Sequence, residues 1–331
     1  MQGVPGRTPD PCLKFHDGWP AQRTQWRAAH SRVPQRMRFF RSCFLAAAML
    51  AGGLCAAAPG TADPPPAAPS IRLATLRAAR PLPPIRFLLT FDDGPDAGED
   101  GSTPLILRQL ADNPVTPGIK ALFFVQTAHP RRGGGEAGKE QMHATCKAGH
   151  RLAVHSGLPD GHVSHTRLAP EELEASLLSG EADIIEQCRG AAQLVRPPNW
   201  AYDDAVQAVY RKLGLAMLMS DVNARDGKIY GWHISLRRRS HINSELAQVK
   251  VALSEQRLAP AGGVVPVVVS FHDTNDYTAS HMTEYLQILV EEARDNGLAL
   301  ADPPFYTDGR QAERAARVRA LSGVYARESW P

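Results

Sequence analysis

The sequence lacks the roughly 20 consecutive apolar residues that a membrane-spanning helix needs, since its longest apolar run, Cys43–Leu54, has twelve. It has no internal repeat. It also lacks a strong basic charge outside residues 1–58, which hold eight Lys/Arg and two Asp/Glu, whereas the other 273 residues hold 29 and 32. These absences predict no permanent membrane span and no nucleic-acid partner. With 43% hydrophobic and 21% charged residues, the chain has the composition of one large globular domain.

The first 84 residues divide into three segments by composition. Residues 1–36 have no apolar periodicity and are expected to be an unstructured extension, natively untranslated if translation begins at Met37. Residues 37–58 combine two arginines, the apolar run and small residues, which is the pattern of a signal peptide. Residues 59–84 are a Pro/Ala-rich linker. We therefore expect an exported protein, periplasmic or extracellular.

Cysteine is scarce, with five residues in the whole chain. Cys12, Cys43 and Cys55 fall in the segments expected to be absent or cleaved, which leaves Cys146 and Cys188 in an oxidising compartment. These two residues form either a disulfide or two separate buried thiols, and the sequence leaves both alternatives open.

From residue 85 onward, short apolar runs alternate with helical patterns. Runs without polar alternation are typical of buried parallel strands, and the segments in question are Phe87–Phe91, Ala121–Val125, Arg151–Val154, Leu194–Val195, Leu215–Met219 and Val264–Phe271. Helices are expected between them, for example over Pro170–Cys188. The pattern predicts an α/β fold, a single distorted TIM-barrel-like (β/α) barrel of seven strands over residues 85–306, followed by a helical tail at 307–331.

Polar residues directly follow these predicted strands. In a barrel of this type the carboxyl ends of the strands carry the chemistry. The residues found there are Asp92, Asp93, His155, Arg196, Asp221, Asp226 and His272. Each alone has an ordinary structural explanation, but acids, imidazoles and a guanidinium on successive strand ends together indicate one active site.

The segment Thr90-Phe91-Asp92-Asp93-Gly94-Pro95 resembles the first motif of the polysaccharide deacetylase family, also called carbohydrate esterase family 4 or the nodulation-type deacetylase homology domain. The resemblance covers about residues 85–300. It continues through Ala121–Val125, Gly149-His150, the His155 region, Arg196-Pro197-Pro198 and Phe271-His272-Asp273. It implies a barrel that removes acetyl groups, chiefly N-acetyl groups, from an acetylated glycan.

The resemblance also implies one divalent metal ion, with Zn²⁺ expected, bound by an aspartate and two histidines. Two imidazoles and one carboxylate leave a coordination position open, as a hydrolytic zinc site requires. By the family match, Asp93 and His155 are ligands, and Asp92 is the general base that activates a water bound to the metal.

Three further roles follow from the family match. Arg196 is expected to orient Asp92, and Asp226 is expected to position Arg196 in turn. His272 is expected to protonate the leaving nitrogen, because an unprotonated amide nitrogen is a poor leaving group at neutral pH. The backbone N–H of Asn199, where the family often has Tyr, is expected to donate to the oxyanion.

The sequence departs from the family at the second histidine ligand, where Pro159 occupies the usual position. His162 and His165 both follow within a loop rich in Gly and Pro. We prefer His162 because a single three-residue insertion then accounts for the distance to Pro170. His165 stays an alternative because Ser164-His165 resembles the Ser-His pair common at this ligand.

Two other departures affect the acetyl and sugar pocket. Gly227 stands where the family often has Trp, and Ser270 where it often has Leu. Trp200 and Trp232 are either replacement surfaces that stack on a sugar ring or ordinary residues of the core or barrel rim. Two alternative functions stay open, a catalytically degenerate glycan-binding relative and a small-molecule amide hydrolase on the same scaffold. The sequence leaves the oligomeric state undetermined.

Overall fold

The structure is a computed structural model that describes residues 81–226 and 237–326. The predicted extension 1–36, the signal peptide 37–58 and the linker up to residue 80 lie outside the described residues, as do Gly227 and Trp232. Among the helices that are described, none combines the length and apolarity needed to cross a membrane.

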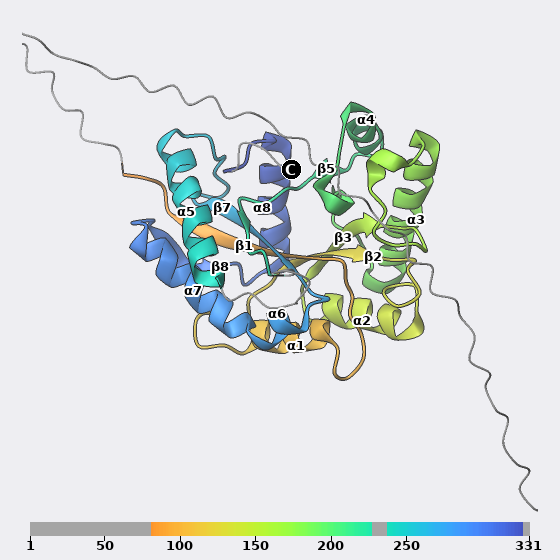
Figure 1. The fold of residues 1–331 in the computed structure, drawn as a ribbon, viewed down its shortest axis with the longest axis horizontal. Helices are drawn as coiled ribbons and strands as arrows, with labels where there is room; N and C mark the ends of the chain where they lie inside the picture. The colour runs from red at the N-terminus through yellow and green to blue at the C-terminus, as the bar shows by residue number, and fades with distance from the viewer. Residues whose placement is uncertain (1–80, 227–236, 327–331) are drawn as a thin grey trace, which may run out of the picture. The chain divides into compact units, whose positions relative to one another are not determined.

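One parallel sheet organises the described chain. Its strands are β1 (Ile85–Asp92), β2 (Leu122–Gln126), β3 (Arg151–Ser156), β4 (Leu194–Val195), β5 (Ala216–Met217), β6 (Val222–Asn223), β7 (Val265–His272) and β8 (Leu300–Phe305). Seven strands run in the order β5-β4-β3-β2-β1-β7-β6, and β8 pairs with β1. With its curled sheet and alternating helices, the structure confirms the predicted distorted (β/α) barrel (Figure 1).

Helices connect the successive strands that pair in parallel, whereas β5 and β6, which do not pair, are joined by a short loop. The helices are α1 (Ser102–Ala111), α2 (Glu136–Lys147), α3 (Pro170–Cys188), α4 (Asp204–Lys212), α5 (Arg238–Ser254), α6 (Asp276–Ser280), α7 (Met282–Asp295) and α8 (Gly309–Ser322), with short 3₁₀ helices at His165–Arg167 and Pro198–Trp200. The longest, α3, has Pro170 in its first turn and ends at Arg189 in the left-handed region with φ 57°. Both are local signals that favour these boundaries.

The two faces of the sheet pack into separate hydrophobic clusters. Alternate residues of β1 such as Phe87 and Leu89 point to the face covered by the connecting helices. Leu88, Leu122 and Phe124 point to the other face, where they pack with apolar residues of α8. Because both faces are buried, the strands are continuously apolar, which explains why they could be recognised in the sequence.

The helix α8 lies within the segment 307–331 that was predicted as a helical tail, and it packs against the sheet. Ala312, Ala315 and Ala316 of α8 are buried against the sheet. Figure 1 shows α8 on the side of the sheet opposite α1 and α6. Alanine permits this close packing because it brings little volume to the contact.

The sheet is open between β5 and β6, which form no pair within the described ranges. Residues after α8 lie at this opening. The Tyr325 hydroxyl accepts a hydrogen bond from the Met219 N–H at 3.0 Å and donates to the Met217 carbonyl at 3.1 Å. Asp221 and Arg319, both fully buried, form an ion pair of 2.8 Å beside it. The C-terminal segment thus satisfies backbone groups that a further strand would otherwise pair.

Cys146 and Cys188 form a disulfide, with their Cα atoms 5.6 Å apart. It joins the last turn of α2 to the last residue of α3. Of the two alternatives that the sequence left open, the structure therefore supports the disulfide.

Candidate metal and acid–base site

A cavity of about 520 Å³ opens at the carboxyl ends of the strands. Its walls combine residues that the sequence indicated with several that it did not: Asp92, Asp93, His155, His162, Pro197, Asn199, Trp200, Asn223, Arg225, His272, Thr274 and Asn275. The strand ends thus bring together side chains that are up to 183 positions apart in the sequence, from Asp92 to Asn275, as the barrel geometry predicted.

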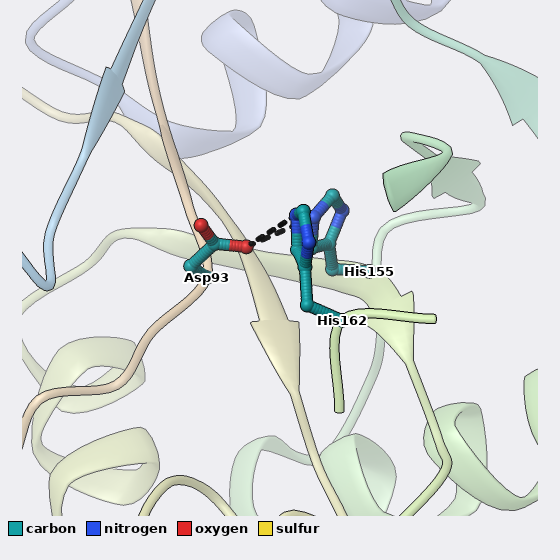
Figure 2. A group of neighbouring side chains, drawn as sticks. All are labelled: Asp93, His155 and His162. Carbon is teal, nitrogen blue, oxygen red and sulfur yellow. Dashed lines mark ion pairs between the residues drawn. The ribbon is translucent and has the colours of Figure 1, made fainter. Parts of the chain in front are cut away.

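Asp93, His155 and His162 form a compact group in which one donor atom from each lies within 4.8 Å of the others. The Nε2 atoms of both histidines lie 3.2 Å from Asp93 Oδ1. Figure 2 shows the two imidazole rings turned toward the same edge of the aspartate. One carboxylate and two imidazoles form the donor set that suits a divalent metal such as zinc.

His155 is oriented for this purpose by its other ring nitrogen. Its Nδ1 donates a hydrogen bond of 2.8 Å to the Arg196 carbonyl, so the neutral imidazole has its lone pair on Nε2. That Nε2 atom is buried and forms no hydrogen bond within the described residues. A buried acceptor left without a donor beside a carboxylate fits a metal ion between them.

His162 reaches the group because the loop after β3 turns sharply at Gly161, which has φ 70°. The positive φ favours glycine here, and a Cβ would lie 2.2 Å from the Gln126 side-chain oxygen, so Gln126 would have to move from its place beside Asp93. The side chain of Gln126 in turn donates to Asp93 Oδ1 at 3.2 Å. Gln126 was not among the residues predicted from the sequence.

His165 does not line the cavity. It is 1% exposed, and its Nδ1 is hydrogen-bonded to the Tyr210 hydroxyl at 2.6 Å. Burial lowers the pKa of His165 to about 3. Of the two histidines that the sequence left as candidates, only His162 lies against Asp93, so the structure does not bring His165 into the donor group.

Asp92 is nearly buried and is fixed by a guanidinium. Arg196, which is fully buried, donates to Asp92 Oδ1 at 2.8 Å and to the Thr90 hydroxyl at 2.7 Å. It also donates to the backbone carbonyls of Leu218 and Met219. This network satisfies the buried guanidinium and keeps the carboxylate of Asp92 in one orientation at the cavity wall.

The structure corrects the role predicted for Asp226, which is bonded to His272 and not to Arg196. Its Oδ1 lies 2.8 Å from His272 Nδ1, and its Oδ2 accepts from the His272 backbone N–H at 2.8 Å and the Thr278 hydroxyl at 2.7 Å. Both oxygens are therefore engaged by β7 and α6. The carbonyls of Leu218 and Met219, directly after β5, take the place that Asp226 was expected to fill around Arg196.

The carboxylates and imidazoles of the cavity shift one another's pKa values. Burial raises the pKa of Asp93, but His155, His272 and His162 outweigh that effect and hold this pKa well below its ordinary value. Burial lowers the pKa of His162, so its imidazole is neutral at neutral pH. Burial by itself also lowers the pKa of His272, whereas Asp226, followed by Asp93 and Asp92, raises it to about 10. An anionic Asp93 and a neutral His162 suit a metal, and a protonated His272 suits an acid.

Of the described residues at which the sequence differs from the family around the pocket, some line the cavity and one does not. Ser270 does not line the cavity. It is buried within β7, and its hydroxyl lies 3.0 Å from that of Ser220. Trp200 does line the cavity, and the Arg196 guanidinium lies over its ring at 5.1 Å. Asn199 also lines it, with φ 59°.

Comparison with known proteins gives a consistent result. Residues 79–218 match the model of the polysaccharide deacetylase family. None of the curated proteins compared with the chain matches it. The resemblance found in the sequence motifs is thereby confirmed over residues 79–218.

Similar solved structures include a chitin deacetylase from Colletotrichum lindemuthianum, which is 19% identical with a TM-score of 0.50 over 66% of this chain and 85% of that one. A family 4 carbohydrate esterase from Streptomyces lividans is 24% identical with a TM-score of 0.46, covering 62% of this chain and 88% of that one. A family 4 acetyl xylan esterase from Clostridium thermocellum is 18% identical with a TM-score of 0.43 over 66% and 87%. The similarity to the chitin deacetylase is one of fold.

Proposed function

We propose that the protein is an exported, metal-dependent hydrolase that removes acetyl groups, chiefly N-acetyl groups, from an envelope or extracellular polysaccharide. The observation that carries the proposal is the shared position of three parts in one cavity. They are the group Asp93, His155 and His162, a carboxylate fixed by a guanidinium, and a histidine with a raised pKa.

In this proposal Asp93, His155 and His162 bind the metal, with Zn²⁺ the ion that best suits two imidazoles and a carboxylate. When bound, such an ion polarises the acetyl carbonyl and lowers the pKa of a water molecule. The polypeptide contributes the geometry, since Arg196 O orients His155 and Gln126 orients Asp93.

Asp92 then acts as the general base. Its Oδ1 is bonded to Arg196, and the carboxylate faces the cavity, where it can take a proton from the water that attacks the acetyl carbon. The backbone N–H of Asn199 is the proposed donor to the oxyanion that develops on the acetyl oxygen.

His272 acts as the general acid. It lies on β7 in register with Asp92 on β1, so the acid and the base stand side by side at one end of the sheet. Its raised pKa keeps it protonated at neutral pH, and Asp226 fixes its ring. A proton from His272 to the nitrogen allows the C–N bond to break, which releases acetate and a free amine.

A sugar substrate suits the remaining walls of the cavity. Trp200 offers an aromatic face for a pyranose ring, while Asn223, Thr274 and Asn275 offer hydrogen-bonding groups. This combination of one aromatic wall with polar groups favours a glycan over a wholly apolar amide.

Acetate release by the full chain, measured with and without added zinc, tests the proposal. The substrates are N-acetylglucosamine oligomers, peptidoglycan and acetylated xylan, which separate N-acetyl from O-acetyl preference. Zinc-dependent release from at least one substrate is expected. Binding of glycan and zinc without acetate release would instead support the degenerate glycan-binding protein.

A further inference from the structure

A second cavity, at the other end of β3 from His155, is lined mainly by arginine. Its volume is about 510 Å³, and its lining consists of Arg151, Cys188, Arg189, Gly190, Arg310, Glu313, Arg314 and Arg317. Arg151 is the first residue of β3, and His155 comes near the end of the same strand. The two cavities therefore lie at opposite ends of the sheet.

Three of the arginines belong to one face of α8. Arg310, Arg314 and Arg317 are spaced i, i+4 and i+7, so their Cα atoms rise by roughly 6 and 10 Å along the helix axis. The opposite face of α8 packs on the sheet through its alanines, which fixes the direction in which the arginines project. The result is a row of positive charges on a rigid support.

The other side of the cavity is equally constrained. Arg189 follows α3 in the left-handed conformation, and the preceding residue, Cys188, is disulfide-bonded to α2. Across the cavity, Arg151 Nε pairs with Glu313 at 2.7 Å, which joins β3 to α8. The backbone positions that carry these arginines are therefore held close to one another by the disulfide and the Arg151–Glu313 ion pair.

Positive charge in this cavity exceeds negative charge. Glu313 is the one acidic residue in its lining, and Arg317 bonds to the neutral side chain of Gln193. In the part of the chain that the structure describes, the exposed guanidiniums of Arg189, Arg310 and Arg314 have no ion pair. Like charges gathered in one concavity repel each other, and a bound anion would relieve that repulsion.

We propose that this arginine cavity binds a phosphate-bearing polymer. Guanidinium groups present paired N–H donors that match the oxygens of a phosphate, and a row of them suits charges repeated along a chain. The hollow shape favours a chain over the flat surface of a lipid bilayer. The proposed active site lies at the other end of β3. A polymer bound in the arginine cavity would therefore hold the protein on that polymer without blocking the proposed active site.

Binding of a fluorescently labelled polyphosphate chain to the full protein tests this inference, with inorganic phosphate as the single-charge comparison. We expect polyphosphate to bind at least about tenfold more tightly than phosphate, because several contacts act on one chain. The double variant Arg310→Gln/Arg314→Gln should weaken polyphosphate binding about tenfold and reduce the slope of log Kd against log salt by about one to two. Both arginines are exposed, so folding should be unaffected.

The matched control is Arg108→Gln/Arg294→Gln, which removes the same charge from exposed positions on α1 and α7. It should change polyphosphate binding less than about twofold. Equal weakening in both double variants would overturn the inference, as would tighter binding to polyglutamate or to phosphatidylglycerol vesicles than to polyphosphate. The assay needs no acetate release, so its outcome is independent of the proposed activity.

Discussion

Replacing His162 by alanine should abolish tight metal binding, whereas replacing His165 should not. His162 Nε2 lies 3.2 Å from Asp93 Oδ1 in the donor group, and the His162 side chain is 40% exposed. Substitutions that only disturb the orientation of a metal ligand typically cost about 10- to 100-fold in metal affinity. Loss of a ligand itself should therefore weaken zinc binding by more than about 100-fold, with less than about 0.5 kcal/mol lost from the metal-free protein's stability.

His165→Ala should have the opposite profile. The substitution deletes a buried hydrogen bond of 2.6 Å and leaves the Tyr210 hydroxyl without this partner. An unsatisfied buried hydroxyl costs about 1–3 kcal/mol, and each kcal/mol lowers Tm by roughly 2–4 °C in a domain of this size. The metal affinity of the folded variant should stay within a few-fold of the wild type.

Competition with a chromophoric zinc chelator measures the affinity, and thermal unfolding in EDTA measures the stability of the metal-free protein. His162→Ala should lose zinc affinity and keep its stability, whereas His165→Ala should lose stability and keep its zinc affinity. If His165→Ala loses zinc while His162→Ala keeps it, the assignment of the second histidine is wrong.

Three further predictions concern the supports of the site. Asp226→Asn removes the charge that raises the pKa of His272, so the alkaline limit of kcat should move to lower pH; an unchanged profile would exclude His272 as the acid. Tyr325→Phe deletes the hydrogen bonds to the backbone of Met217 and Met219, and Met219 in turn accepts from the Arg196 guanidinium that orients Asp92. We therefore expect kcat to fall with little change in KM, and an unchanged kcat would show that Tyr325 does not act on the base through Arg196. Cys146→Ser/Cys188→Ser should lower the free energy of unfolding by up to about 4 kcal/mol, the loop-closure value for the separation of 42 residues, as measured by urea denaturation.

The parts of the fold that could be predicted are those whose signal is local. The strands β1, β2 and β7 are buried on both faces, and their apolar runs are visible without any knowledge of their partners. The strand β6 has two residues and β8 contains two prolines, so neither has the pattern of a buried strand. The packing of α8 depends on contacts with strands elsewhere in the chain, β1 among them more than 200 residues away, which periodicity cannot reveal.

The site residues also divide into those with a local sequence signal and those that depend on contacts between distant segments. Asp92, Asp93 and Arg196 stand in short motifs, so the sequence was sufficient to select them. The partner of Asp226 could not be selected in this way, because its bond to His272 depends on how the segment after β6 meets β7. Gln126 gave no sequence signal beyond its position at the end of a strand. Contacts across the barrel, and not residue types, decide these assignments.

The most direct test of the proposed hydrolysis is a comparison of wild type with Asp92→Asn on N-acetylglucosamine oligomers, measuring acetate released and zinc bound in the same samples. The wild type should release acetate in a zinc-dependent manner. The variant should bind zinc equally well and release essentially none, because Arg196 still orients the side chain but the base is gone. Acetate release by Asp92→Asn at the wild-type rate, or none by zinc-loaded wild type on any acetylated glycan tried, would contradict the account.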